Sequence, residues 1–211
     1  MTVGRTPTDH LDLADWRRRV GDLYRMDGDG VLSRFRAGRD DLFRTHPQSP
    51  IPAADRDAFD GLRYFPANDG CRVRCRLEPH PDEDELVIDT GGEDGEIRYR
   101  RAGRLHFRLH GTECGLTVFA MTTYGGGLFL PFRDQTSGSE TYGGGRYLFD
   151  TVKGTDGLAL VLEGGDRLQI DFNCAYNPSC AYDSRWACPL APPENRLPVA
   201  VRAGEKAYHD G

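Results

Sequence analysis

Hydrophobic residues near the start of the chain recur at helical spacing. At intervals of three and four, with charged residues between them, lie Leu13, Trp16, Val20 and Leu23. This spacing predicts an amphipathic helix over residues 11–24, with Thr8 or Asp9 capping its start. A second, weaker helix is predicted by the apolar residues Leu32, Phe35, Leu42 and Phe43. The proline-rich stretch 46–52 cannot be helix interior, so it is an ordered linker or a lid.

The period changes to two from about Phe59 onward, where apolar and polar residues alternate as they do in β-strands. Alternating runs occupy residues 71–77, 105–109, 158–162 and 167–172, and further strands are expected at 85–89, 95–101, 115–122, 127–132 and 145–150. Glycine pairs and Asp-Gly steps separate these runs, which is typical of tight turns. About nine short strands without helices between them predict a mainly β fold, an antiparallel barrel or sandwich.

The domain organisation follows from these two patterns. Residues 1–45 are expected to form an N-terminal helical segment packed on the barrel, and residues 46–211 a β domain. Residues 174–211 are irregular and proline-rich, so we expect them to wrap the barrel as a C-terminal segment. Asn195 and Glu205 are the polar residues expected to tie this segment down.

The composition of the chain limits the classes of molecule that it is expected to bind. The chain of 211 residues has a net charge of -6, which argues against a broad nucleic-acid-binding surface. Neither an apolar stretch of about 20 residues nor an apolar signal core is present, so we expect a cytoplasmic protein without a membrane partner, with reduced thiols. A homo-oligomer is left open, and no cofactor is expected.

The segment 132–150, FRDQTSGSETYGGGRYLFD, concentrates polar groups directly after an apolar strand. Such groups are costly to order unless they bond to each other or to a ligand. The candidate ligand-binding residues in it are Arg133, Asp134, Ser137, Tyr142 and Arg146. An arginine pair suits a carboxylate or similar anion, and Glu140 is the candidate acid or base. The alternative is an ion-paired turn in which Asp134 and Glu140 neutralise the two arginines.

The stretch 172–189 contains Cys174, Cys180 and Cys188, whose spacings of five and seven do not match a zinc site, and no metal is expected. A Cys180–Cys188 disulfide would close a short loop, but a reducing compartment argues against its persistence. A nucleophilic cysteine needs a base, and no histidine lies between Cys174 and Cys188. Buried structural thiols are the favoured interpretation, as they are for Cys71 and Cys75 on the first strand.

The sequence resembles a bacterial and archaeal family of unknown function, DUF1684. The resemblance rests on RDDLFRTHPQSPI (39–51), FDGLRYFP (59–66), FRDQTSGSETYGGGRYL (132–148) and DFNCAYNPSCAYDSRWACPLAPPENRLPVAVRAGE (171–205). It implies that residues 46–211 form a domain like that of the family, with a shared polar constellation. In the family's pattern Cys180 and Cys188 align with the motif thiols. It implies no activity.

A small anionic molecule is the partner that the sequence favours. We expect segments 133–140 and 173–177 to meet at the mouth of the barrel, where small barrels hold ligands. Arg133 and Arg146 would bind the anion and Glu140 would exchange protons, while Asn173, Tyr176 and Asn177 would complete the site with Tyr142. Whether the protein is an enzyme stays open. The alternative is a non-catalytic binding or scaffold protein whose arginine–carboxylate network is structural.

Overall fold

The computed structural model describes residues 6–82, 84–89 and 95–209. Two helices, α1 (Pro7–Tyr24) and α2 (Val31–Thr45), precede the sheet. The strands of the described residues are β1 (Arg72–Glu78), β2 (Glu85–Asp89), β3 (Glu96–Leu109), β4 (Thr112–Met121), β5 (Leu128–Phe132), β6 (Arg146–Asp150), β7 (Leu160–Gly164) and β8 (Arg167–Asp171). Short 3₁₀ turns lie between them and in the C-terminal segment.

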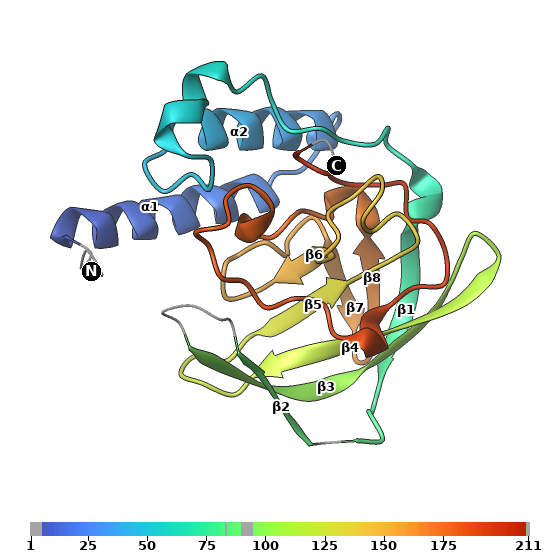
Figure 1. The fold of residues 1–211 in the computed structure, drawn as a ribbon. Helices are drawn as coiled ribbons and strands as arrows, with labels where there is room; N and C mark the ends of the chain where they lie inside the picture. Colours follow the sequence, from blue (N-terminus) through green and yellow to red (C-terminus); the bar gives the residue numbers. More distant parts are fainter. Residues whose placement is uncertain (1–5, 83, 90–94, 210–211) are drawn as a thin grey trace.

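The strands form one antiparallel sheet that curls into a half-barrel (Figure 1). Its order is β6-β5-β4-β3-β1-β8-β7, with β2 paired to β3 beside this path. The two helices lie together beyond one end of the sheet (Figure 1). The prediction of a mainly antiparallel β fold with two N-terminal helices is confirmed, and its barrel form is closer to the structure than the sandwich.

The described residues form eight strands instead of nine because two predicted runs are one strand. The runs 95–101 and 105–109 join in β3, whose register against β4 shifts between Arg101 and Gly103. A Cβ atom at Gly103 would lie 2.6 Å from the carbonyl oxygen of Glu78, so the bend requires glycine. The gap between the two predicted runs is therefore a β-bulge within one strand and not a turn between two strands.

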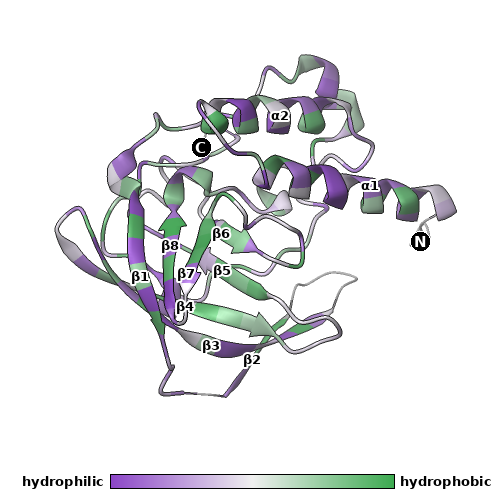
Figure 2. Cartoon of the chain, turned by 180° about the vertical axis from the view of Figure 1, so that it is seen from behind, coloured by the Kyte–Doolittle hydropathy of each residue, from purple (hydrophilic) through white to green (hydrophobic). Residues whose placement is uncertain are grey.

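The first helix begins slightly earlier than predicted. The Thr6 Oγ1 accepts a hydrogen bond from the Asp9 amide at 3.2 Å, and the Asp9 carboxylate accepts one from the Thr6 amide at 2.7 Å. This reciprocal pair is a capping box, and Pro7 occupies the first helical position. Both helices alternate polar and apolar residues along their length (Figure 2), as amphipathic helices do.

The helices share the hydrophobic core of the sheet. Val20 and Tyr24 of α1 belong to the same buried cluster as Phe35 of α2 and the strand residues Phe132 and Tyr147. The Tyr24 and Phe35 rings meet edge to face, with centroids 4.7 Å apart. Because both rings are 1% exposed, removing the helices would uncover a large part of the core. No helix among the described residues is long and apolar enough to cross a bilayer.

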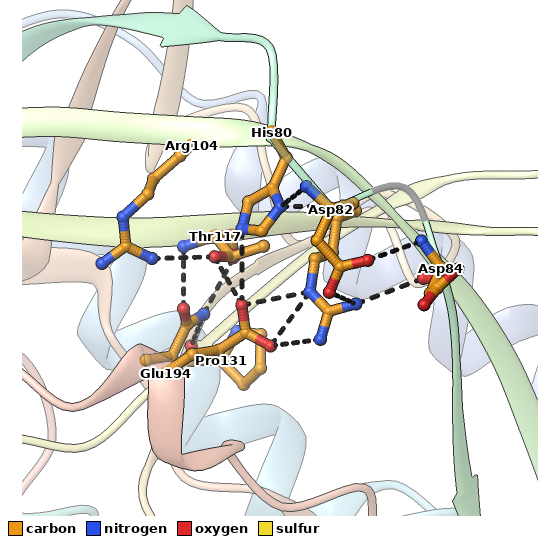
Figure 3. A network of polar contacts seen from close by, with 9 residues as sticks. His80, Asp82, Asp84, Arg104, Thr117, Pro131 and Glu194 are labelled. Atoms are coloured by element: carbon orange, nitrogen blue, oxygen red, sulfur yellow. Dashed lines mark hydrogen bonds and ion pairs between the residues drawn. The ribbon is translucent and has the colours of Figure 1, made fainter.

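The C-terminal segment is fastened across the outside of the sheet by two neighbouring residues (Figure 3). The Asn195 side chain donates to the carbonyls of Thr117 and Pro131, both at 2.8 Å, and accepts from the Thr117 amide at 2.7 Å. Glu194 pairs with Arg101 at 2.9 Å and accepts from the Thr117 hydroxyl at 2.8 Å. Asn195 therefore ties the segment to β4 and β5, as predicted.

Candidate functional site

Arg146 is a fully buried cation whose hydrogen bonds bind other parts of the chain. It is 1% exposed and lies at the start of β6. It donates to the Asp134 carboxylate at 2.9 Å and to the carbonyl oxygens of Val201 and Glu205 at 2.8 and 3.0 Å. A buried charge requires such partners. Of the ion-paired alternative, the structure contains the Arg146–Asp134 pair, and the Arg146 hydrogen bonds hold the C-terminal segment against β6.

The rest of the polar segment forms a compact turn. The Asp134 carboxylate accepts from the Thr136 amide and hydroxyl at 2.7 and 2.6 Å, and the Ser137 hydroxyl accepts from the Asp134 amide at 3.1 Å. Arg133 donates to the Gly144 carbonyl at 3.3 Å. These contacts give Asp134, Ser137 and Arg133 partners within the protein.

Glu140 and Tyr142 point to different surroundings. Glu140 pairs with Arg202 at 2.8 Å, and its side chain is 38% exposed. The hydrogen bond from Arg202 lowers the pKa of this carboxyl, so it is charged at neutral pH. The Tyr142 hydroxyl lies 3.6 Å from the Cys180 Sγ. Glu140 therefore neutralises Arg202 and not Arg133, while Tyr142 lies beside a thiol.

The second predicted segment follows β8 and is buried throughout. The Asn173 side chain donates to the Asn68 carbonyl at 2.9 Å and to the Asp171 carboxylate at 2.7 Å. The Tyr176 hydroxyl lies 2.7 Å from the Thr155 Oγ1. Burial raises the pKa of Tyr176 well above its usual value, so it remains a neutral phenol. Asn173 thus fixes a turn, and Tyr176 is a buried phenol bonded to Thr155.

β6 pairs with the second predicted segment, residues 173–177, and both contact the C-terminal segment. The amides of Tyr147 and Tyr176 each donate to the other's carbonyl, at 2.8 and 2.9 Å. The backbone of Glu205 accepts from Arg146, and its carboxylate accepts from the Asn177 amide at 2.8 Å. The mouth of the half-barrel is therefore built from β6, the turn after β8, and residues 201–206.

Sequence reasoning missed the buried ion pair between Arg39 of α2 and Glu205. Arg39 is 4% exposed and Glu205 is 1% exposed, and the same carboxylate accepts from the Tyr182 hydroxyl at 2.6 Å. Burial alone would lower the pKa of Arg39, but the Glu205 carboxylate outweighs it and raises that pKa, so Arg39 stays charged. Arg39 follows Phe35 by four residues, which places it on the apolar face of the helix. An arginine on the apolar face of a predicted helix is the sequence feature that could have indicated a buried ion pair.

A cavity of about 240 Å³ lies where α1 and α2 meet β6, the turn after it and residues 176–188. At roughly 30 Å³ per molecule this volume equals about eight waters. Apolar and aromatic side chains form much of its wall, among them Trp16, Val20, Phe43, Tyr147 and Trp186. Of the predicted site residues, Tyr176 and Asn177 line this cavity.

Two polar atoms of this cavity lining have no hydrogen-bond partner among the described residues. They are the Asn177 Oδ1 and the Trp186 Nε1, and both atoms are buried. The Asn177 Nδ2 donates to the Lys206 carbonyl at 2.7 Å, which fixes the amide orientation and leaves the oxygen free. Buried polar atoms are nearly always paired with protein or water. Two residues of the cavity lining therefore each keep one unused hydrogen-bonding atom, an acceptor on Asn177 and a donor on Trp186.

The charged groups of the cavity lining are all cationic. They are Arg17, Arg39 and Lys153, and no carboxylate lines the cavity within the described ranges. Arg39 is balanced by Glu205 and Lys153 by Asp150, whose carboxylate lies 3.2 Å away. Arg17 has no carboxylate partner in the part of the chain that the structure describes. The lining thus includes one exposed arginine that has no carboxylate partner among the described residues.

The cysteines divide into two groups. Cys71, Cys75, Cys114 and Cys174 are buried, whereas Cys180 and Cys188 are partly exposed, and all six are free thiols. The prediction of buried thiols is correct for Cys71, Cys75 and Cys174 and wrong for Cys180 and Cys188, because the loop that carries them runs over the surface between two cavities. No group of three or more metal-binding side chains occurs within the described residues.

Comparisons with known proteins give a family and a related structure. A family model described as a protein of unknown function (DUF1684) matches residues 57–206. The solution NMR structure of an uncharacterized protein from Haloarcula marismortui is 36% identical, covers 93% of this chain and 96% of its own, and has a TM-score of 0.61. No curated protein matches the chain.

Proposed function

The chain belongs to the DUF1684 family, whose function is unknown, and we propose that it binds a small monoanion with an apolar body in the cavity between the helices and the half-barrel. The observation that carries this proposal is the pair of unpartnered atoms, the Asn177 Oδ1 and the Trp186 Nε1. A carboxylate accepts the indole N–H, and a hydroxyl group on the same ligand donates to the amide oxygen. Aromatic walls favour an aryl or branched aliphatic body.

The charge of the cavity wall supports an anion over a cation or a neutral ligand. Arg17 supplies an exposed guanidinium without a carboxylate partner within the described ranges, and Lys153 offers a flexible ammonium whose own partner, Asp150, is outside the lining. We place the anion against these groups and not against Arg133 and Arg146, because Arg146 is fully buried outside this cavity and both its Nη1 and Nη2 donate to other parts of the chain.

The proposal gives the predicted site residues two roles. Tyr176 and Asn177 contact the ligand from the floor of the cavity. Four other predicted residues have a structural role, because they bond to the protein itself: Arg146, Asp134, Ser137 and Asn173. The proposal therefore combines ligand binding with a structural arginine–carboxylate network. Acid–base chemistry by Glu140 is not part of the proposal, because Glu140 does not line this cavity and pairs with Arg202.

A thermal-shift comparison of matched compounds tests the proposal. We expect 4-hydroxybenzoate, at 100 times its Kd, to raise the melting temperature by about 5–10 °C, since such saturation stabilises a protein by about 2.7 kcal/mol. The neutral 4-hydroxybenzamide should give little or no shift. Equal shifts from acid and amide, or no shift from any aryl or branched aliphatic monoacid, would overturn the proposal.

A further inference from the structure

Cys180 and Cys188 lie side by side although eight residues separate them in the sequence. The Cys180 amide donates to the Cys188 Sγ at 3.4 Å, so the sulfur of one cysteine lies against the backbone of the other. The Cys180 Sγ also contacts the Tyr142 hydroxyl at 3.6 Å. The contact between the two cysteines makes them direct neighbours, which is the first condition for a disulfide between them.

The surroundings leave this pair accessible and able to move. Cys180 lines a cavity of about 450 Å³, and Cys188 lines the separate cavity of about 240 Å³. Cys180 belongs to a single 3₁₀ turn, Ser179–Ala181, and no helix or strand follows before Cys188. A sulfur–sulfur bond could therefore form by adjusting one loop, without breaking regular structure.

The contact also makes the two thiols unequal. The hydrogen bond from Cys188 lowers the pKa of Cys180 to about 6 against the opposing effect of burial, with smaller contributions from Tyr142 and Lys153. In the same contact the pKa of Cys188 rises, because its thiol donates the hydrogen bond. A low-pKa, accessible thiol beside a protonated partner is the arrangement of an attacking and a resolving cysteine.

We propose that Cys180 and Cys188 form a two-thiol redox site that reduces a hydroperoxide and closes into an intramolecular disulfide. The Cys180 thiolate attacks the terminal oxygen of the hydroperoxide, and the O–O bond breaks. The alkoxide takes a proton from solvent and leaves as alcohol (as water from hydrogen peroxide), and Cys180 becomes a sulfenic acid. The Cys188 sulfur then attacks the Cys180 sulfur. The S–O bond breaks, and the hydroxide leaves as water with the Cys188 proton.

The cycle is completed by a dithiol reductant, which reduces the disulfide to two thiols and is itself oxidised to a disulfide. This site is independent of the proposed anion site, because its evidence is the contact between the thiols and not the unpartnered atoms of the cavity. Binding of a carboxylate and oxidation of Cys180 can therefore succeed or fail separately.

The experiment uses hydrogen peroxide as the oxidant on the reduced full chain. Near-equimolar peroxide should remove two of the six thiols, lower the intact mass by two hydrogens and give a Cys180–Cys188 cross-linked peptide that dithiothreitol reverses. The Cys188→Ser variant should stop at a Cys180 sulfenic acid that dimedone captures. The Cys180→Ser variant should lose thiols at least about tenfold more slowly, while Cys114→Ser should behave as wild type.

Two results would overturn the proposal. One is oxidation of Cys180 no faster than that of the buried Cys114 in wild-type protein. The other is a wild-type product without the Cys180–Cys188 cross-link. Both are read from peptide maps of wild-type protein, so they do not depend on whether a variant folds.

Discussion

Trp186 and Asn177 each bury one polar atom that the protein leaves without a partner. Such an atom loses its hydrogen bonds to water and gains none, so it costs free energy in the empty protein. The Tyr24 hydroxyl and the Arg146 Nε are also buried without a partner, but neither residue lines the cavity. At the residue scale, the ligand-binding proposal depends on the two atoms of Trp186 and Asn177.

Trp186→Phe should separate binding from stability. Removing an unsatisfied N–H breaks no hydrogen bond, so the unfolding free energy should change by less than about 1 kcal/mol. Affinity for 4-hydroxybenzoate should fall about tenfold, equivalent to about 1.4 kcal/mol. Calorimetric titration and denaturant unfolding measure the two quantities. The exposed Tyr124 provides the control Tyr124→Phe, and equal affinities of the two variants would contradict the role of the indole.

The reactivity of Cys180 should follow its lowered pKa. At pH 7 a thiol of pKa about 6 is about 90% thiolate, whereas an ordinary cysteine is mostly protonated. The alkylation rate with iodoacetamide should therefore be near its maximum at pH 7 and fall as the pH drops through about 6. Cys188→Ala removes the hydrogen bond and should move the midpoint upward. A wild-type midpoint at the ordinary value of about 8.5 would contradict this prediction.

At the scale of elements, α2 and the C-terminal segment are joined by an ion pair between two residues that are 166 positions apart in the sequence. Arg39 and Glu205 are both buried, and the Arg39 guanidinium lies over the rings of Phe43 and Tyr176 at 5.0 and 5.5 Å. The same carboxylate accepts from Tyr182. Arg39 also lines the cavity, so loss of the pair affects both the fold and the site.

Arg39→Met should destabilise the protein by about 3–5 kcal/mol, because it leaves the Glu205 carboxylate buried without its cation. Adding Glu205→Gln should recover part of the loss, since a neutral amide is cheaper to bury. Denaturant unfolding gives both values. Arg18→Met, which removes an exposed arginine of α1, should barely change the unfolding free energy. A loss below about 1 kcal/mol for Arg39→Met would show that the pair is not needed.

The glycine run before β6 offers a matched pair of substitutions. Gly145 has a φ of +94°, and a Cβ there would lie 2.6 Å from the Phe132 carbonyl oxygen. Gly143 has no positive φ, and its nearest atom would be 3.6 Å away. Gly145→Ala should cost at least about 2 kcal/mol from strain and overlap, and Gly143→Ala should be near neutral. Similar unfolding free energies for the two variants would contradict the structure of this turn.

The elements were largely predictable because their patterns are local. Alternation located the strands from β1 to β8, and spacing of three and four located both helices. The long β3 is predicted as two runs because the alternation of apolar and polar residues is interrupted at the bulge near Gly103. The residue-level site was less predictable. Arg133 and Arg146 look like anion ligands in the sequence and Glu140 like an acid or base, but their partners Gly144, Val201 and Arg202 are known only after folding.

At the scale of the whole molecule, the charge of the cavity lining and the net charge of the chain have opposite signs. The chain carries a net charge of -6, yet the lining of the inner cavity is cationic. Composition predicted the absence of a broad basic surface but could not locate this small basic site, because Arg17, Lys153 and Trp186 come from three distant parts of the sequence. They meet only because the helices close over the half-barrel.

The most direct test follows the indole N–H resonances of ¹⁵N-labelled protein during titration with 4-hydroxybenzoate. The chain has two tryptophans, and Trp186→Phe assigns their signals. The account predicts that the Trp186 signal moves downfield and saturates as its N–H donates to the carboxylate, while 4-hydroxybenzamide leaves it in place. A Trp186 signal that stays unmoved at millimolar acid, or that moves equally with the amide, would contradict the claim that the cavity binds a small anion.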